Sequence, residues 1–512
     1  MSSLNRRDFL KLALAAGSLP AVERMAHSLP AQAAYGLQTG AKPNIIIILF
    51  DALSAANLSL YGYPRRTTPN LERFAARATV YHNHHSAGNF TTPSTASLLT
   101  GVYPWNHRAF NLSGLVRPAL RPNNLFAAIG DGYHRHVFTQ NVYADMLLHQ
   151  FNDQIEQHDP LDRFSLVSSS IYSRLTPNDA IYGMKSLDQF LFKREEAHAS
   201  LFLSIFNDLS LQVRDRLQSA AWAKTYPGGL PRLANTDIYF AFEQLTDGLM
   251  QLVSGLPGPS FAYLHLMPPH APYLPARRFL GAFADGWAPP EIKKHRLAAG
   301  LTQEKLNGQR QTYDEFIANL DDEFGRLLDH LQRSGLLDNS YVIFTSDHGE
   351  LFERGVTGHS TPLLFEPVLR IPLIIAAPGQ AERRDVHALT SNVDLLPTLA
   401  QLAGRPTPEW CEGRLLPGLG GEEDPQRSAF VIEAKANAAY GRLRKASTAL
   451  LKGPLKLVHY QGYRYYRDEY ELYDLSEDPQ ELNNRFDDHP AAGDLLDELN
   501  RAQQTADAPY QA

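Results

Sequence analysis

Cysteine is almost absent from this chain. Cys411 is the single cysteine among 512 residues, so no internal disulfide can form. The sequence contains no run of about 18 uncharged apolar residues, and we therefore expect no transmembrane helix. Basic residues are not in excess either, since the net charge is -7, which disfavours nucleic acid as a partner. A hydrophobic fraction of 44% is enough for one large domain and a smaller one.

Two adjacent arginines mark the N-terminal segment. Asn5-Arg6-Arg7-Asp8-Phe9-Leu10-Lys11 precedes a modest apolar run from Leu12 to Leu19. This order is typical of a twin-arginine signal, and Ala31-Gln32-Ala33 offers small residues for cleavage. The alternative is a basic N-terminal tail. We expect residues 1–33 to be a signal peptide read by the twin-arginine export machinery, and the mature protein to be periplasmic or extracellular.

Four apolar runs predict the strands of a buried, mostly parallel sheet. They span residues 44–50, 261–266, 341–344 and 373–376. An amphipathic helix is expected over residues 313–331, where apolar side chains recur at helical spacing. Strands that alternate with helices in this way indicate an α/β protein.

The stretch from Asn89 to Gly101 predicts a helix that begins beside a threonine. Thr92 precedes Pro93 and should be extended, whereas Pro93 suits the first helical position. Thr91 would then stand at the positive end of a helix dipole, where free N–H groups can face an anion. An ordinary capped helix is the alternative.

Carboxylates and a histidine follow two of the predicted strands. Asp51 ends the first strand, and Asp347-His348-Gly349 follows the third. Ligands bind at the carboxyl ends of strands in open α/β sheets. Two carboxylates and an imidazole suit one divalent cation, and these residue types do not distinguish Zn²⁺, Mn²⁺, Ca²⁺ and Mg²⁺. A polar turn is the alternative for the tripeptide alone.

Six motifs follow one another in an order that resembles the sulfatase family of the alkaline phosphatase superfamily. Near Thr91 the sequence matches the family's nucleophile motif at Pro93, Ser94, Leu98, Thr100 and Gly101. The other matches are the strand before Asp51, Thr68-Pro69-Asn70-Leu71, Pro269-His270-Ala271-Pro272-Tyr273, Asp347-His348-Gly349 and Glu471-Leu472-Tyr473-Asp474-Leu475.

The resemblance covers about residues 43–485, apart from a central stretch. It implies a three-layer alkaline-phosphatase-like sandwich with a mostly parallel central sheet over residues 43–405. A helical insertion is expected at about residues 150–255, where peripheral contact with a membrane surface is one option. A small C-terminal α+β subdomain is expected over residues 422–512.

Three positions depart from the family pattern. Thr91 stands where the family has a cysteine or serine that is oxidised to formylglycine, and Thr95 replaces an arginine. Ala52 replaces the second carboxylate of the calcium-type sulfatases. The site is more similar to the single-metal site of lipoteichoic acid synthases and phosphoethanolamine transferases, which use a threonine nucleophile.

The resemblance also implies roles for individual residues. Thr91 would be the nucleophile, and His270 and His359 would act as general acids or contact the transferring group. The expected metal ligands are Asp51, Thr91, Asp347 and His348. Weaker candidates for substrate binding are Thr92, His107 and Asn111. Glu350 is expected to orient His348 or cap a turn, Asp321 and Asp322 to be structural, and His82, His84 and His85 to form a solvated strand edge or loop.

These features predict an exported, metal-dependent hydrolase or transferase that acts on phosphate esters. The substrate would be an ester of a small molecule, a lipid head group or a glycan. Two alternatives stay open from the sequence: a true sulfatase, and a non-catalytic periplasmic binding protein that keeps the fold.

The export signal can be tested directly. Replacing Arg6 and Arg7 together by lysine should leave the precursor in the cytoplasm, because the export machinery recognises the paired arginines. Cell fractionation and immunoblotting measure the distribution. Normal accumulation of the double variant outside the cytoplasm would contradict the assignment.

Overall fold

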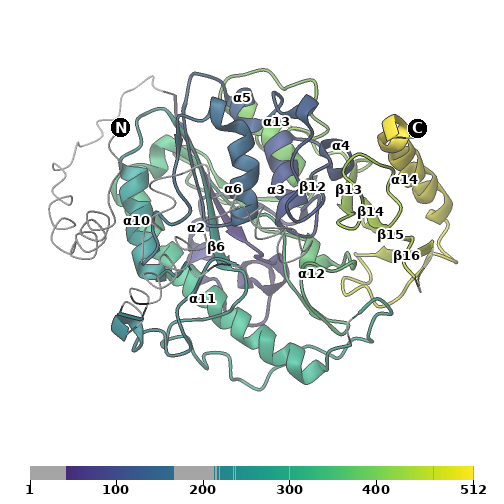
Figure 1. Ribbon diagram of the computed structural model, residues 1–512, viewed down its shortest axis with the longest axis horizontal. Coiled ribbons are helices and arrows are strands. Elements are labelled where there is room, and N and C mark those ends of the chain that lie inside the picture. The colour runs from purple at the N-terminus through teal and green to yellow at the C-terminus, as the bar shows by residue number, and fades with distance from the viewer. Residues whose placement is uncertain are drawn as a thin grey trace, which may run out of the picture. The chain divides into compact units, whose positions relative to one another are not determined.

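The computed structural model describes residues 42–166 and 220–510, apart from residues 235, 237, 299, 465 and 467, together with residues 213, 216 and 217 (Figure 1). The predicted signal peptide and the middle of the predicted insertion lie outside these residues, so both stay predictions. Within the part of the chain that is described, no helix has the length and apolar character needed to span a bilayer.

An eight-stranded sheet forms the centre of the fold, in the order β11-β2-β10-β7-β1-β6-β4-β5. Its strands are β1 (Asn44–Asp51), β2 (Thr79–Tyr81), β4 (His134–Thr139), β5 (Gln157–His158), β6 (Ser260–Pro269), β7 (Ser340–Ser346), β10 (Leu373–Ala376) and β11 (Arg384–Val386). β10 runs antiparallel to both of its neighbours, and the other pairs are parallel. The predicted mostly parallel sheet is confirmed.

The side chains of β1 alternate between two hydrophobic cores, as the pleat of a strand requires. Ile46, Ile48 and Phe50 point into one core, and the alternate residues point into the other. The first core is closed by α2 (Pro69–Ala75), α10 (Phe242–Ser254) and α11 (Gln303–Arg333). The second is closed by α3 (Thr91–Thr100), α5 (Leu125–Ile129), α6 (Val142–Leu148) and α13 (Leu395–Leu402) (Figure 1). The three predicted layers are therefore present.

A second, antiparallel sheet lies in the C-terminal part of the chain. It consists of β13 (Ser428–Glu433), β14 (Ala446–Lys452), β15 (Leu455–Gln461) and β16 (Glu469–Asp474), with α14 (Ala492–Asp507) packed on it. Tyr103 and Trp105 share a core with Ile432 of this sheet. Residues 40–512 accordingly form one compact unit. The predicted domain bounds stay predictions.

Two histidines that we expected at a solvated edge are buried. Strand β3 (His84–His85) pairs in parallel with β12 (Thr390–Ser391). His84 Nδ1 lies 3.0 Å from Thr390 Oγ1, and His85 Nε2 lies 3.0 Å from Glu366 Oε2. The expectation was wrong for both residues, because a strand far along the chain covers them and local sequence does not show that pairing.

Asp321 joins two helices of the first layer. It lies on α11 and accepts hydrogen bonds at 2.8 Å from the backbone N–H groups of Asn70 and Leu71. These are N–H groups of the first turn of α2, which no preceding carbonyl satisfies. Asp321 is buried, whereas Asp322 is partly exposed and pairs with Arg278 at 2.7 Å.

Asp321→Ala should lower the free energy of unfolding by about 2 kcal/mol, because it leaves buried N–H groups without an acceptor. Asp322→Ala is the matched control on the neighbouring residue, and it should change stability by less than about 0.5 kcal/mol because its ion pair is exposed. Denaturant titration followed by circular dichroism measures both. Equal losses in the two variants would contradict the capping role.

Candidate active site

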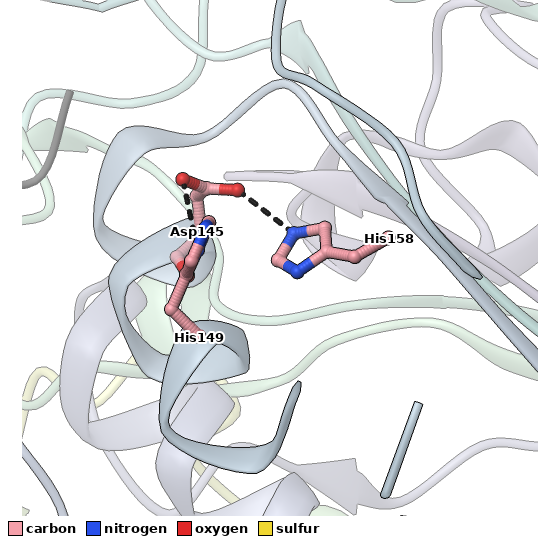
Figure 2. A group of neighbouring side chains, drawn as sticks. All are labelled: Asp145, His149 and His158. Carbon is pink, nitrogen blue, oxygen red and sulfur yellow. Dashed lines mark hydrogen bonds and ion pairs between the residues drawn. The ribbon is translucent and has the colours of Figure 1, made fainter. Parts of the chain in front are cut away.

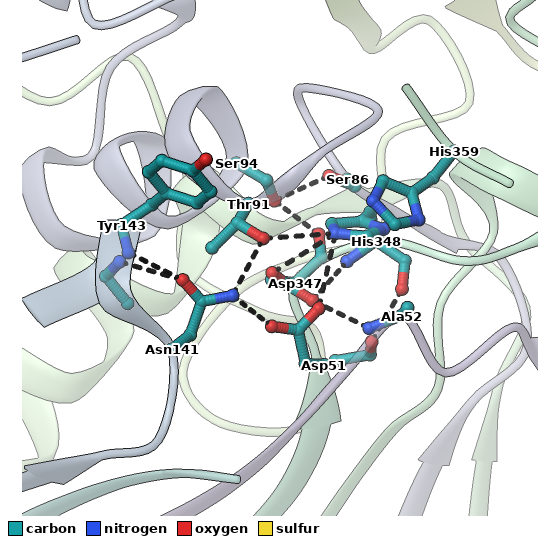
Figure 3. Close-up of polar contacts among 12 residues, drawn as sticks. Asp51, Ala52, Ser86, Thr91, Ser94, Asn141, Tyr143, Asp347, His348 and His359 are labelled. Carbon is teal, nitrogen blue, oxygen red and sulfur yellow. Dashed lines mark hydrogen bonds and ion pairs between the residues drawn. The ribbon is translucent and has the colours of Figure 1, made fainter. Parts of the chain in front are cut away.

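Asp51, Asp347 and His348 come together at the carboxyl ends of β1 and β7 (Figure 3). The two strands are parallel neighbours with Phe50 opposite Ser346, so the residues that follow lie side by side. One potential ligand atom from each of the three residues lies within 4.8 Å of the others. All three side chains are fully buried. The structure thus brings together three of the four predicted metal ligands through strand register alone.

Thr91, the fourth, enters from α3. It is the first residue of that helix, and no side chain caps this end. The predicted start was wrong by two residues, because Thr92 is helical rather than extended and Pro93 is the third helical residue rather than the first. Thr91 Oγ1 lies 3.4 Å from His348 Nε2 and accepts a hydrogen bond of 3.2 Å from Asn141 Nδ2. Ser94 Oγ donates to the Asp347 carbonyl, which ties α3 to the Asp-His turn. The hydroxyl therefore sits beside the carboxylates at the positive end of the helix.

The protonation pattern of His348 leaves a lone pair directed at the two carboxylates. Its Nδ1–H donates to the Gly349 carbonyl at 2.9 Å, so in the neutral ring Nε2 carries no proton. Nε2 lies 3.5 Å from Asp51 Oδ1 and 3.4 Å from Asp347 Oδ2. Both carboxylate oxygens are buried and lack a hydrogen-bond partner among the described residues. Three electron-rich atoms that face one another in this way fit a divalent cation.

A second imidazole that the sequence analysis did not include faces the same carboxylates. His265 lies on β6, and its Nδ1 is 3.2 Å from the Tyr263 hydroxyl. Its buried Nε2 lacks a hydrogen-bond partner in the part of the chain described. That atom lies 3.5 Å from Asp51 Oδ2 and 3.9 Å from Asp347 Oδ2. The signal in the sequence was one histidine within an otherwise apolar strand.

Backbone groups hold the carboxylates in place. Asp347 Oδ1 accepts from Ala52 N at 3.1 Å and from His348 N at 2.9 Å. Ala52 has a φ of 60°, a left-handed conformation, and its carbonyl accepts from the Tyr313 hydroxyl at 2.6 Å. Burial raises the pKa of Asp347, and the charge of Asp51 raises it further. Burial would also raise the pKa of Asp51, but neighbouring histidines, His270 first, hold it below its usual value.

His270 and His359 lie next to His348. The ring centres of His348 and His359 are 4.2 Å apart, and those of His359 and His270 are 4.9 Å apart. His359 Nδ1 lies 3.1 Å from Glu350 Oε1, which also fixes the role of that carboxylate. We expected Glu350 to orient His348 or cap a turn, but it contacts His359 instead. Burial would raise the pKa of Glu350, and His359 and other histidines lower it.

Asn141 is a further residue that motif reasoning missed. It is the N-cap of α6, and its Oδ1 accepts from Tyr143 N at 2.8 Å and Ala144 N at 3.2 Å. The other end of the same amide donates to Thr91 Oγ1 and to Asp51 Oδ2 (Figure 3). One side chain thus links the start of a helix to both the threonine and a carboxylate. A polar residue just after a strand, here β4, was the available signal.

The three weaker candidates have partners within the protein. The Thr92 hydroxyl donates to the Leu112 carbonyl at 2.5 Å. His107 is buried, with Nε2 3.1 Å from Ser97 Oγ and Nδ1 accepting from Ala109 N at 3.0 Å. Asn111 donates to the carbonyls of Lys435 and Asn437, at 2.8 and 3.0 Å. These contacts stabilise the segment after α3, and the substrate contact predicted for the three residues stays a prediction.

Lys435 brings a positive charge from the C-terminal part of the chain. Its Nζ donates to the Ser360 carbonyl at 2.7 Å, next to His359. The same nitrogen lies 6.0 Å from the centre of the Phe90 ring, and Phe90 directly precedes Thr91. Burial lowers the pKa of Lys435, and its Glu433 neighbour partly offsets this. A residue outside all the recognised motifs therefore places an ammonium group next to the residue that follows His359 and near the ring of the residue that precedes Thr91.

Comparison with known proteins assigns the chain to a family. A family model described as "Sulfatase" matches residues 43–141 and 211–405. The chain belongs to the sulfatase family. A second model, "N-sulphoglucosamine sulphohydrolase, C-terminal", matches residues 359–506. The family comprises hydrolases that are generally metal-dependent, and the residues around Asp51 are the candidate ligands here.

Individual relatives of the family resemble the chain at low identity. The choline-sulfatase of Rhizobium meliloti is 25% identical over 482 residues, which cover 87% of this chain and 83% of that protein. The N-acetylgalactosamine-6-O-sulfatase of Bacteroides thetaiotaomicron is 24% identical, covering 91% and 94%. The crystal structure of the phosphonate monoester hydrolase of Agrobacterium radiobacter aligns with a TM-score of 0.65 at 20% identity, covering 92% and 96%. The predicted alkaline-phosphatase-like fold is confirmed.

Mutation can separate the two roles of Asn141, which caps α6 and also contacts Thr91 and Asp51. Asn141→Ser should keep the helix cap, because serine caps about as well as asparagine, yet it removes the amide that reaches Thr91 and Asp51. We expect stability within about 0.5 kcal/mol of wild type, with turnover reduced roughly tenfold or more. Asn141→Ala should lose the same activity and also about 1 kcal/mol of stability. Wild-type turnover in the serine variant would contradict the positioning role.

Proposed function

We propose that this sulfatase-family enzyme is a metal-dependent hydrolase or transferase of phosphate esters, with Thr91 as the nucleophile. The observation that carries the proposal is the placement of Thr91 Oγ1, 3.4 Å from His348 Nε2 and 3.2 Å from Asn141 Nδ2, at the uncapped start of α3. A threonine cannot be converted to formylglycine. Its own hydroxyl is therefore the group that this position offers for attack.

One divalent cation would be held by Asp51, Thr91, Asp347 and His348, and we add His265 as a further ligand. Calcium-type sulfatases have a second carboxylate at the position of Ala52. His265 would take the place of that ligand, because its unpartnered Nε2 faces both Asp51 and Asp347. When bound, the cation would lower the pKa of a coordinated hydroxyl and neutralise charge on the ester oxygens. Zinc, manganese, calcium and magnesium all remain candidates for this site.

The residues of the chain then account for both halves of a phosphoryl transfer. Thr91 Oγ forms a bond to phosphorus as the bond from phosphorus to the leaving alcohol oxygen breaks. The threonine proton passes to solvent, and the leaving alcohol oxygen gains a proton that a protonated His270 or His359 can deliver as general acid. In the second step the same imidazole takes a proton from the water or acceptor hydroxyl that attacks phosphorus. The bond from phosphorus to Thr91 Oγ then breaks, and Thr91 Oγ regains a proton from solvent. Lys435 and the N–H groups at the start of α3 would bind the non-bridging oxygens.

Sulfate esters are the second candidate, because the named relatives are mostly sulfatases. Formylglycine releases sulfate through its own second hydroxyl, and threonine has no such group. A sulfated Thr91 would need water to attack sulfur directly. We therefore rank phosphate esters above sulfate esters for this chain, and leave the alcohol open among small molecules, lipid head groups and glycans.

We also propose that the enzyme works outside the cytoplasm. The support is the twin-arginine pattern at residues 5–11, which lies outside the described residues. Peripheral membrane contact through residues 150–255 is a further proposal. Residues 167–212 of that stretch also lie outside the described residues.

The cation can be tested by metal content. Asp51→Ala, Asp347→Ala and His348→Ala should each lose one tightly bound equivalent relative to wild type, and His265→Ala should bind that equivalent at least about tenfold more weakly. Metal is counted by elemental analysis after reconstitution and gel filtration. Glu350→Gln is the control, because that carboxylate contacts His359 rather than the cluster. Full occupancy in all three alanine variants would refute the site.

Thr91 can be tested by chemistry. Thr91→Ala should keep the metal through the other ligands and lose turnover by a factor on the order of 10³ or more. Thr91→Ser should keep partial activity, since the hydroxyl remains and only the methyl group is lost. Mass spectrometry of acid-quenched enzyme during turnover of a phosphodiester should find phosphate on the peptide that contains Thr91.

The substrate class needs a panel that compares an aryl sulfate, a phosphate monoester, a phosphate diester and a phosphonate ester on the purified, metal-reconstituted protein. Phosphoesters should have the highest kcat/KM. A preference of tenfold or more for the aryl sulfate, or an active Thr91→Ala variant with an unmodified peptide, would overturn the proposal.

A further inference from the structure

A second cluster of potential ligands lies at the other end of α6 from Asn141. Asp145 is on the helix, His149 begins the following 3₁₀ helix η5 (His149–Gln154), and His158 is in β5 (Figure 2). His158 Nε2 is 3.0 Å from Asp145 Oδ1. His149 Nδ1 is 3.3 Å from Asp145 Oδ2 and 2.8 Å from the Asp145 carbonyl oxygen. The two imidazole rings have centres 4.4 Å apart. The Thr91 chemistry uses none of these three side chains.

The fold brings the three residues together for local reasons. Asp145 and His149 are four residues apart and so lie on one face of the helical segment. His158 is opposite Val137 in the parallel pairing of β5 with β4, the strand that precedes α6. One potential ligand atom from each lies within 4.8 Å of the others. A carboxylate and two imidazoles are the ligand set of many zinc sites.

The two ring nitrogens of His158 have different neighbours. Its Nδ1 lies 2.7 Å from Asn152 Oδ1, and its Nε2 lies 3.0 Å from Asp145 Oδ1. With the proton of the neutral ring on Nδ1, facing Asn152 Oδ1, the lone pair of Nε2 faces the Asp145 carboxylate. A shared cation would bind both of these electron-rich atoms.

The exposure of the cluster suits an ion that enters from solvent. The Asp145 side chain is 5% exposed, that of His158 11%, and that of His149 25%. The carboxylate therefore lies at the base and His149 at the surface. A buried carboxylate stays charged only if a cation or protonated group accompanies it.

We propose that Asp145, His149 and His158 bind one divalent cation of the zinc type, with solvent completing its coordination. The site is separate from the one at Thr91 and does not depend on the proposed reaction. It would join the end of α6 to β5, while Asn141 joins the start of the same helix to the active site. The ion would therefore hold the end of the helix whose start is held by Asn141.

The test is a Zn²⁺ titration of the metal-free full-length mature protein by isothermal calorimetry. Wild type should bind one equivalent more than His158→Ala, and Asp347→Ala should still bind that equivalent. His149 is the most exposed of the three side chains. The His149→Ala variant should bind the additional Zn²⁺ equivalent at least about tenfold more weakly than wild type, since the substitution removes one of three protein ligands. His387→Ala is the control, because His387 stacks on the partly exposed His82 outside both clusters and should change neither stoichiometry nor affinity.

A second readout covers variants that fold poorly. At one Zn²⁺ concentration, Zn²⁺ should raise the melting temperature of Asp347→Ala by more than that of Asp347→Ala with His149→Ala, because stabilisation by a ligand bound to the folded state grows with its affinity. Equal Zn²⁺ stoichiometry and affinity in wild type, His149→Ala and His158→Ala would overturn the proposal. So would the absence of any Zn²⁺-dependent shift in Asp347→Ala, which would leave imidazolium as the partner of Asp145.

Discussion

Two buried carboxylates at neighbouring strand ends constrain the rest of the structure. Asp51 and Asp347 follow parallel strands in the centre of the sheet, where water cannot screen their charges. Backbone N–H groups and the Asn141 amide bond one side of the pair, while unpartnered oxygens and imidazole nitrogens face one another on the other side. The cation that we propose would balance these carboxylate charges and would be bound by the Nε2 atoms of His348 and His265. The positive end of α3 lies at the same place.

Sequence reasoning found the parts of this arrangement that lie in continuous motifs. Apolar runs predicted β1 and β7, and the residues suspected at their ends do lie close together, because the carboxyl ends of parallel strands meet at one edge of the sheet. His265 was missed, since one polar residue in an apolar strand looks the same whether it faces a core or a ligand. Asn141 and Lys435 were missed for another reason. Their positions depend on where β4 and the C-terminal sheet pack, and no short-range pattern encodes that. His84 and His85 were mispredicted for the same reason. They were expected to be solvated, but a pairing with a strand distant in the sequence buries them.

Thr91 and Ala52, two of the positions at which the chain departs from the family pattern, lie at the same candidate metal site. Ala52 removes a carboxylate, and His265 supplies a neutral donor near the remaining two, so the cluster carries less negative charge than one with three carboxylates. A less negative centre repels a phosphoryl group less. In the proposed function Thr91 offers a single hydroxyl, so the covalent intermediate would be opened by an external oxygen. Both departures are therefore reasons to rank phosphate esters above sulfate esters in that proposal.

The contacts of Asn111 and Lys435 have a consequence for how the protein is made. Asn111, just after the nucleophile helix, is bonded to the backbone of a loop that begins at the end of β13, and Lys435 of that loop reaches the Ser360 carbonyl. Every proposed ligand of the cation is synthesised before this loop. A nascent chain still held in the ribosome, or a product cut before the second sheet, would therefore contain the whole ligand set but an unfinished rim. In the proposed function, a working centre would form only after the segment that contains Lys435 and Asn437 has been released and has packed against Asn111 and Ser360.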